Sequence, residues 1–256
     1  MKRVQQEADA DPTVLRLSLD AKATVKIGPF SRGGKSRIKV QASDHDFGKQ
    51  KLTPWGILLP KYDELFLYCT RSKVTSDFIV DTLERWWLDN KRRFPMVTTL
   101  LLTQDNGPEN HSRRTQFMAR LVAFSHQHHL NIRLAYYPPY HSKYNAIERC
   151  WGILEMHWNG GLLDSVDAVL KYAKTMTWKG KHPAVNLVPG VYKTGVKLTA
   201  KAMAAVETQL QRLPDLGKWF VDIHLTSDKF WPIDSCGEAD GMGGIRHCLA
   251  GGQDFL

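Results

Sequence analysis

Residues 136–151 read YYPPYHSKYNAIERCW, and this segment sets the architecture that we expect on either side of it. Its two adjacent prolines cannot donate hydrogen bonds to a sheet, so a strand should end before them. A helix is predicted beyond them, with Ser142 as its N-cap and apolar side chains at helical spacing. Glu148 follows Asn145 by three residues, so both side chains should leave the same edge of this helix.

A second informative segment lies upstream. Residues 97–103, VTTLLLT, form an aliphatic and β-branched run that is typical of a buried strand, and QDNGP follows at once. Asp105 should therefore lie at the C-terminal end of a strand. Ordinary turn formation by Asp-Asn-Gly also explains these residues, so this segment alone does not indicate a functional site.

Composition and charge limit the classes of protein to consider. The 256 residues are 43% hydrophobic and 24% charged, which is typical of a globular chain with one or two domains. The 35 Lys and Arg outnumber the 26 Asp and Glu, and the net charge of +9 indicates a polyanionic partner such as nucleic acid, although a generic basic surface is the alternative. We find no apolar run long enough to span a bilayer and no signal sequence, and therefore expect a cytoplasmic protein without a membrane partner.

The remaining segments suggest alternating strands and helices, an order that favours a mixed sheet with helices on its faces. The loop at 29–37 is basic and Gly-rich, so its cations could contact phosphate, while a solvated loop is equally consistent. The predicted strands are 14–19, 25–28, 55–60, 64–69, 97–103 and 131–136, and the strands 55–60 and 64–69 should form a hairpin. The predicted helices begin near 75, 112, 142 and 164, and a further helix is predicted near 199–212. Thr75 or Ser76 should cap the first of these helices.

Three acidic residues could converge in such a sheet. Asp20 follows the first strand and Asp105 a later one, and these residues lie side by side if the two strands are neighbours, while Glu148 reaches them from a helix. Carboxylates so close repel one another unless divalent cations neutralise them. Two Mg²⁺ ions held there could activate a water or a 3′-hydroxyl and stabilise the leaving oxygen of a phosphodiester.

These residues also carry a family resemblance. Asp20 before Ala-Lys, Asp105 within QDNGPEN and Glu148 within HSKYNAIE resemble the acidic triad of DDE transposases. The run from Asp105 to Gly160 resembles the ISAzo-type insertion-sequence transposases more narrowly, and the mariner-like superfamily shares the Ser-x-x-Asn-x-Ile-Glu element more distantly. The similarity extends over residues 14–228.

The resemblance implies a ribonuclease H-like catalytic core that cleaves DNA and joins it to a target. Asp20, Asp105 and Glu148 would be catalytic ligands of two Mg²⁺ ions, or of Mn²⁺, and Ser142 and Asn145 would position them or the DNA strand. Transposon ends and target DNA would be the partners, within a homo-oligomeric, nucleoid-associated synaptic complex. The expected DNA contacts are Lys22, Arg32, Lys35, Arg37, Arg113, Arg114 and Lys143.

The expected domain organisation is a loose segment at 1–12, the catalytic core at 13–177, an α-rich C-terminal extension at 178–234 and a disordered tail at 235–256. Related transposases place a DNA-recognition region before the core, and this chain resembles a catalytic domain without it. Two alternatives therefore stay open. One is a truncated, inactive remnant that still binds DNA, and the other is a ribonuclease H-like nuclease that acts alone.

Overall fold

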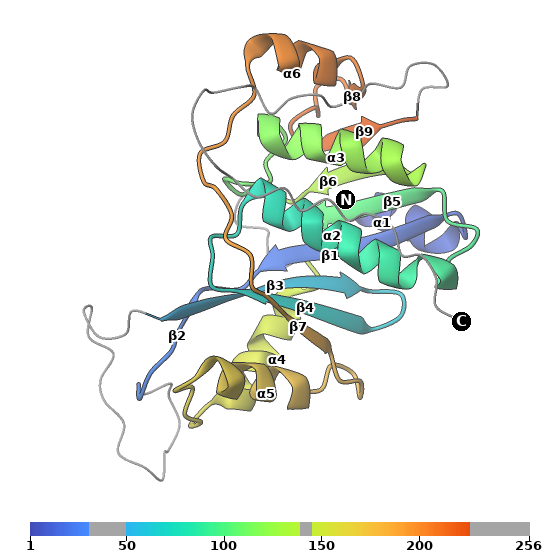
Figure 1. The fold of residues 1–256 in the computed structure, drawn as a ribbon. Coiled ribbons are helices and arrows are strands. Elements are labelled where there is room, and N and C mark those ends of the chain that lie inside the picture. The colour runs from blue at the N-terminus through green and yellow to red at the C-terminus, as the bar shows by residue number, and fades with distance from the viewer. Residues whose placement is uncertain (31–49, 139–144, 226–256) are drawn as a thin grey trace, which may run out of the picture. The chain divides into compact units, whose positions relative to one another are not determined.

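Five strands form the centre of a mixed sheet (Figure 1). β1 (Val14–Ala21) pairs antiparallel with β3 (Lys51–Leu59) and parallel with β5 (Thr99–Gln104). β3 continues antiparallel into β4 (Glu64–Thr70), and β5 continues parallel into β6 (Asn131–Tyr136). The predicted hairpin and the predicted strands at 14–19, 97–103 and 131–136 are therefore confirmed.

This computed structural model describes residues 1–30, 50–138 and 145–225, all of which lie within the compact unit Met1–Thr226. Several predictions lie outside the described residues: the loop cations Arg32, Lys35 and Arg37, the motif residues Ser142 and Lys143, and the tail at 235–256.

Further strands extend the sheet at both edges. β7 (Ala184–Val188) pairs parallel with β4, while β9 (Phe220–Ile223) pairs antiparallel with β6 and is followed outward by β8 (Leu210–Arg212). The short strand β2 (Val25–Lys26) pairs with β3. In the described ranges the order is β7-β4-β3-β1-β5-β6-β9-β8, which confirms the predicted α/β class with a mixed sheet.

The C-terminal extension is not α-rich. The described part of residues 178–234 contains one helix, α6 (Ala200–Glu207), and the three strands β7, β8 and β9. The helix predicted near 199–212 ends at Glu207, because the next residues turn and Leu210–Arg212 pair with β9 instead. Pairing with strands distant in the sequence decides these elements, and local propensity does not reveal it.

Two helices cover one face of the sheet. α2 (Ser76–Asn90) continues into the 3₁₀ helix η1 (Lys91–Arg93), and α3 (Thr115–His128) packs beside α2. The hydroxyl of Thr75 accepts a 3.3 Å hydrogen bond from the Phe78 amide, which confirms one of the two N-caps predicted for α2. The fully buried side chains in the core of this face include Leu17, Trp86, Leu102, Phe117 and Leu134.

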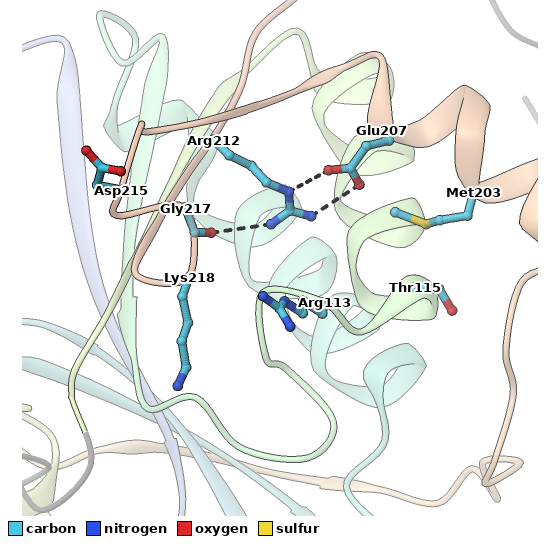
Figure 2. A pocket seen from close by; sticks show the side chains of 8 residues that line it. All are labelled: Arg113, Thr115, Met203, Glu207, Arg212, Asp215, Gly217 and Lys218. Carbon is cyan, nitrogen blue, oxygen red and sulfur yellow. Dashed lines mark hydrogen bonds and ion pairs between the residues drawn. The ribbon is translucent and has the colours of Figure 1, made fainter.

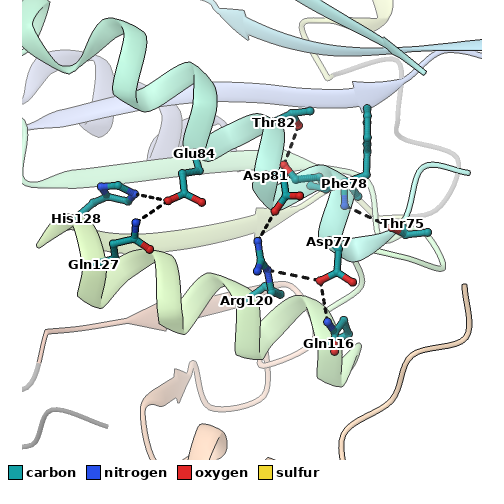
Figure 3. Close-up of polar contacts among 11 residues, drawn as sticks. Thr75, Asp77, Phe78, Asp81, Thr82, Glu84, Gln116, Arg120, Gln127 and His128 are labelled. Atoms are coloured by element: carbon teal, nitrogen blue, oxygen red, sulfur yellow. Dashed lines mark hydrogen bonds and ion pairs between the residues drawn. The ribbon is translucent and has the colours of Figure 1, made fainter. Parts of the chain in front are cut away.

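Polar contacts align these two helices (Figure 3). Arg120 of α3 forms ion pairs with Asp77, at 3.5 Å, and with Asp81 of α2. Farther along, Glu84 accepts a 2.7 Å hydrogen bond from Gln127. Burial raises the pKa of Asp81, and the Arg120 charge opposes that rise. The contacts therefore fix the position of α3 along α2.

Three further helices cover the opposite face of the sheet. α4 (Glu148–Trp158) and α5 (Val166–Thr175) pack on the β2, β3, β4 and β7 side of the sheet through a second buried cluster. α1 (Lys2–Ala10) packs against Leu101 and Ala135 of the central strands. The residues next to Leu101 and Ala135 in the chain point to the face covered by α2 and α3. Successive side chains of a strand point to opposite faces, so α1 covers the opposite face of the sheet. Among the described residues, no helix is long and apolar enough to cross a membrane.

The expectation of a loose segment at 1–12 is wrong for α1. Its side chains Met1, Val4 and Ala8 are spaced along one helical stripe and contact the sheet. Polar contacts also hold the helix, because the Gln5 amide donates a 2.6 Å hydrogen bond to the Tyr137 hydroxyl. The apolar stripe is narrow within a polar sequence, which explains why hydropathy alone did not predict the helix.

Candidate active site

Asp20 and Asp105 lie at equivalent positions along two neighbouring parallel strands. In the register of β1 and β5, Ser18 pairs with Thr103, and each acid follows its member of this pair by two residues. The Thr103 hydroxyl donates a 3.0 Å hydrogen bond to the Leu17 carbonyl and joins the strands at this point. The two strands are neighbours, as the sequence analysis required for Asp20 and Asp105 to lie side by side.

The carboxyl group of Asp20 carries the clearest electrostatic signal of the site. Its pKa is raised from 3.8 to about 7, mainly by burial and also by the negative charges of Asp105 and Glu148, while a hydrogen bond from Trp151 opposes the rise. Both other acids of the triad therefore act on Asp20. The three side chains converge from β1, from the end of β5 and from the start of α4.

The loop after Asp105 is held by its own polar side chains. The Asn110 amide donates a 3.2 Å hydrogen bond to the Asp105 carbonyl, and the Asn106 side chain accepts one of 3.1 Å from the Ser112 amide. A Cβ atom on Gly107 would lie 2.8 Å from the Asn110 side-chain oxygen, so any other residue here would require Asn110 to shift. The residues of QDNGPEN thus shape the loop that carries the second acid.

Asn145 joins the start of α4 to β1. Its side-chain nitrogen donates a 3.0 Å hydrogen bond to the Leu19 carbonyl, and its oxygen accepts a hydrogen bond from the Ser18 hydroxyl. The same hydroxyl accepts a 3.1 Å hydrogen bond from the Ile147 amide. Asn145 and Ser18 are almost fully buried, so these bonds are protected from water and fix Glu148 beside the strand that carries Asp20.

The helix of the motif begins later than predicted. α4 starts at Glu148, whose amide donates a 3.1 Å hydrogen bond to the Asn145 carbonyl, and Asn145 itself lies in the preceding turn. Asn145 and Glu148 therefore do not share a helix edge. The side chain of Asn145 bonds to β1 instead, because buried amide groups must find partners.

Two residues that sequence reasoning did not assign to the site complete it. The indole nitrogen of Trp151 donates a 2.7 Å hydrogen bond to Oδ2 of Asp20. Gly56 pairs with Asp20 across β1 and β3, and a Cβ atom there would lie 2.5 Å from Ile147 and 2.7 Å from Trp151. Glycine thus lets α4 approach the sheet. The helical spacing of Trp151 indicated only a core residue, and no local signal marked Gly56.

The donor set of the triad fits a hard divalent cation. Three carboxylates offer only oxygen ligands, the type that Mg²⁺ and Mn²⁺ prefer, and a cation would offset the repulsion that raises the pKa of Asp20. Within the described residues, no three His, Cys, Asp or Glu side chains are grouped at metal-ligand spacing. The three acids thus approach one another but are not yet at the spacing of a metal-bound set.

The three described residues that were predicted to contact DNA differ in their surroundings. Lys22 is 7% exposed and forms an ion pair with Glu155, and Arg114 forms a 3.0 Å ion pair with Glu109, so both cations are engaged in contacts within the protein. Arg113 is exposed. A role in DNA contact stays a prediction for all three residues.

Comparison with known proteins identifies the family of the segment that contains the three acids. The family model described as "Rhodopirellula transposase DDE domain" matches residues 1–225. The chain belongs to this transposase family. Membership in the DDE transposase family confirms the resemblance carried by the contexts of Asp20, Asp105 and Glu148, and the match includes every described strand and helix.

A solved structure and the curated proteins add little to this result. The structure titled "Mos1 transposase paired-end complex with left transposon end" matches with a TM-score of 0.48 and 13% identity, over 67% of this chain and 49% of that chain. The present chain thus spans about half the length of that protein. A TM-score below 0.5 supports no functional conclusion. Comparison with curated proteins gives no match.

Proposed function

We propose that this chain is the catalytic domain of an insertion-sequence transposase that cleaves DNA and joins it to a target by metal-dependent phosphodiester chemistry. One observation carries the proposal: the register of β1 and β5 places Asp20 and Asp105 at equivalent positions on neighbouring strands, and the bonds of Asn145 and Trp151 hold the helix that begins at Glu148 against β1. Membership in a transposase family supports the reaction class.

Asp20, Asp105 and Glu148 are the residues that would hold two Mg²⁺ ions or Mn²⁺. Bound ions supply activation of a water or 3′-hydroxyl and stabilisation of the leaving oxygen. Trp151 orients the Asp20 carboxylate by donating to one of its oxygens, and Asn145 keeps the start of α4 against β1. These supporting contacts hold the acids in place before substrate arrives.

The net charge of +9 supports DNA as the partner, since phosphate backbones attract basic proteins regardless of sequence. Transposon ends and target DNA are the proposed substrates. Joining them requires two ends to be brought together, so a homo-oligomeric, nucleoid-associated complex is the assembly that we propose.

The test is nicking and strand transfer on labelled DNA that carries the ends of the host element, in Mg²⁺ or Mn²⁺. Wild type is compared with Glu148→Gln and with Glu7→Gln, which alters an exposed carboxylate of α1. Activity that only Glu148→Gln removes supports the proposal. Inactivity of all three proteins with intact circular dichroism indicates an inactive remnant, and cleavage restricted to RNA–DNA hybrids indicates a stand-alone nuclease.

A further inference from the structure

A second candidate site lies where the C-terminal hairpin meets the start of α3 (Figure 2). A cavity of about 550 Å³ opens between α3, α6 and the turn that joins β8 to β9. Three cations and two acids are among its lining residues. They are Arg113, Arg212, Lys218, Glu207 and Asp215.

One of the three cations has a structural role. The Arg212 guanidinium forms an ion pair with Glu207, and its Nη1 donates a 2.8 Å hydrogen bond to the Ser112 carbonyl. It also donates to the Gly217 carbonyl at 3.4 Å. Arg212 therefore clamps the hairpin turn to the loop before α3, and Glu207 neutralises its charge. The charge that attracts a ligand must come from the other two cations.

Arg113 and Lys218 supply that charge. Both are exposed, and in Figure 2 both side chains extend to the same side of Arg212. Within the described ranges neither forms an ion pair with a carboxylate. The Lys218 ammonium lies 4.8 Å from the centroid of the Trp219 ring, a contact that restricts the side chain without cancelling its charge. Two cations without an ion pair among the described residues thus face one cavity from two different elements, and Asp215 is the one carboxylate of the lining that is not paired with Arg212.

We propose that this cavity binds a backbone phosphate of duplex DNA. Arginine offers a planar pair of donors that suits phosphate oxygens, and lysine adds a compact charge. Contacts of this kind position a protein on DNA without reading its sequence. The inference rests on the proposed function, because it assigns a contact to the DNA on which the triad would act.

The cavity is joined to the loop that carries the second acid. Arg113 follows Asp105 by eight residues, which span at most about 28 Å when extended. This is less than one turn of B-DNA, about 34 Å, so one duplex can reach both places. The loop between them is folded by the bond from the Ser112 amide to Asn106, and Arg212 holds the Ser112 carbonyl. A phosphate in the cavity would thus fix the duplex relative to Asp105.

The experiment measures binding of the full chain to a fluorescent 40-base-pair duplex, without divalent metal, over a range of salt concentrations. The test variant is Arg113→Gln/Lys218→Gln. The matched control, Lys91→Gln/Arg92→Gln, removes one lysine and one arginine from η1, which precedes β5 whereas Asp105 follows it. All four positions are exposed, so both proteins should fold, and thermal unfolding checks this.

We expect the test variant to lose about 10- to 100-fold in affinity at 0.1 M salt and to lower the magnitude of the slope of log K against log salt by about 0.9, which is the contribution of one phosphate contact. The control should keep the wild-type slope. An unchanged slope in the test variant, or an equal fall in the control, overturns the proposal.

The same series separates this proposal from the proposed function. Asp105→Asn should bind with the wild-type slope while its nicking is lost. If nicking depends on Asp105 but Arg113→Gln/Lys218→Gln binds like wild type, the transposase function stands and the phosphate site is wrong. If the wild type does not bind the duplex at all, both proposals are wrong.

Discussion

Trp151 Nε1 lies 2.7 Å from Oδ2 of Asp20, so the helix that carries Glu148 also holds the first acid of the triad. Trp151 follows Glu148 by about one helical turn. A shift of α4 would therefore disturb two acids together.

Trp151→Phe keeps an aromatic side chain but removes the donor to Asp20. The Asp20 carboxylate loses a fixed orientation, so we expect nicking activity to fall about 10- to 100-fold and to require more Mg²⁺, as is usual when a partner of a metal ligand is lost. Trp158→Phe is the control, because it removes an indole that donates to Glu155 on the same helix. Identical Mg²⁺ titrations for Trp151→Phe and wild type would contradict the prediction.

Asp20→Asn should stabilise the metal-free protein above neutral pH. Burial, together with Asp105 and Glu148, raises the folded-state pKa of Asp20 from 3.8 to about 7, so the folded state binds this proton more tightly than the unfolded state. The free energy of unfolding therefore decreases as pH rises from about 4 through 7. In EDTA at pH 8, urea unfolding should show the variant to be about 1 to 4 kcal/mol more stable, with the difference disappearing near pH 4.

Asp11 provides a control of opposite sign. Hydrogen bonds from the side chain and amide of Thr13 lower the pKa of Asp11, so the ionised form stabilises the folded state. Asp11→Asn should consequently lose stability at pH 8 and not at low pH. A decrease in the stability of Asp20→Asn at pH 8 would show that the Asp20 carboxylate is not electrostatically strained.

Asn145→Ala should lower the free energy of unfolding by about 2 to 3 kcal/mol, because the Leu19 carbonyl and the Ser18 hydroxyl lose a buried partner. Ser18→Ala and the double variant complete a double-mutant cycle. We expect the two effects to be strongly non-additive, as for residues in one hydrogen-bond network. Additive effects in urea unfolding would show that the two side chains do not cooperate.

Gly56→Ala should destabilise the protein by about 1 to 3 kcal/mol and reduce nicking, because its Cβ would overlap with Ile147 and Trp151 and push α4 from the sheet. Gly152→Ala on the exposed side of α4 is the matched control. No atom lies within 4 Å of its Cβ position, so this substitution should stabilise the helix by about 0.5 to 1 kcal/mol. Equal effects of the two substitutions on thermal unfolding would be inconsistent with close packing at Gly56.

The elements that the sequence predicted well are those decided by local pattern. The strands β1, β5 and β6 and the start of α2 can be recognised from the sequence, because strands and amphipathic helices repeat their hydrophobic residues with different periods. The acids near the ends of β1 and β5 could also be assigned to strand ends, but the pairing of these two strands comes from the structure. Sequence alone could not show their partners Trp151 and Gly56.

The errors arise where distant contacts override local pattern. α1 is stabilised by a narrow stripe against the sheet, and β7 and β8 exist because other strands offer them hydrogen bonds. The ion pairs of Lys22 with Glu155 and of Arg114 with Glu109 could not be read from the sequence either. The three elements and the Lys22 pair depend on residues tens of positions away or on burial, which propensity does not record.

The pairing of β7 with β4 and of β9 with β6 has a consequence for synthesis of the protein. Both neighbours of the five central strands come from residues after 183, so a ribosome that has released only the segment as far as α5 leaves the outer edges of β4 and β6 without these partners. Unpaired strand edges promote association between chains. The nascent transposase would therefore be most prone to aggregation just before β7 and β9 emerge, and chaperone dependence should be concentrated in that interval.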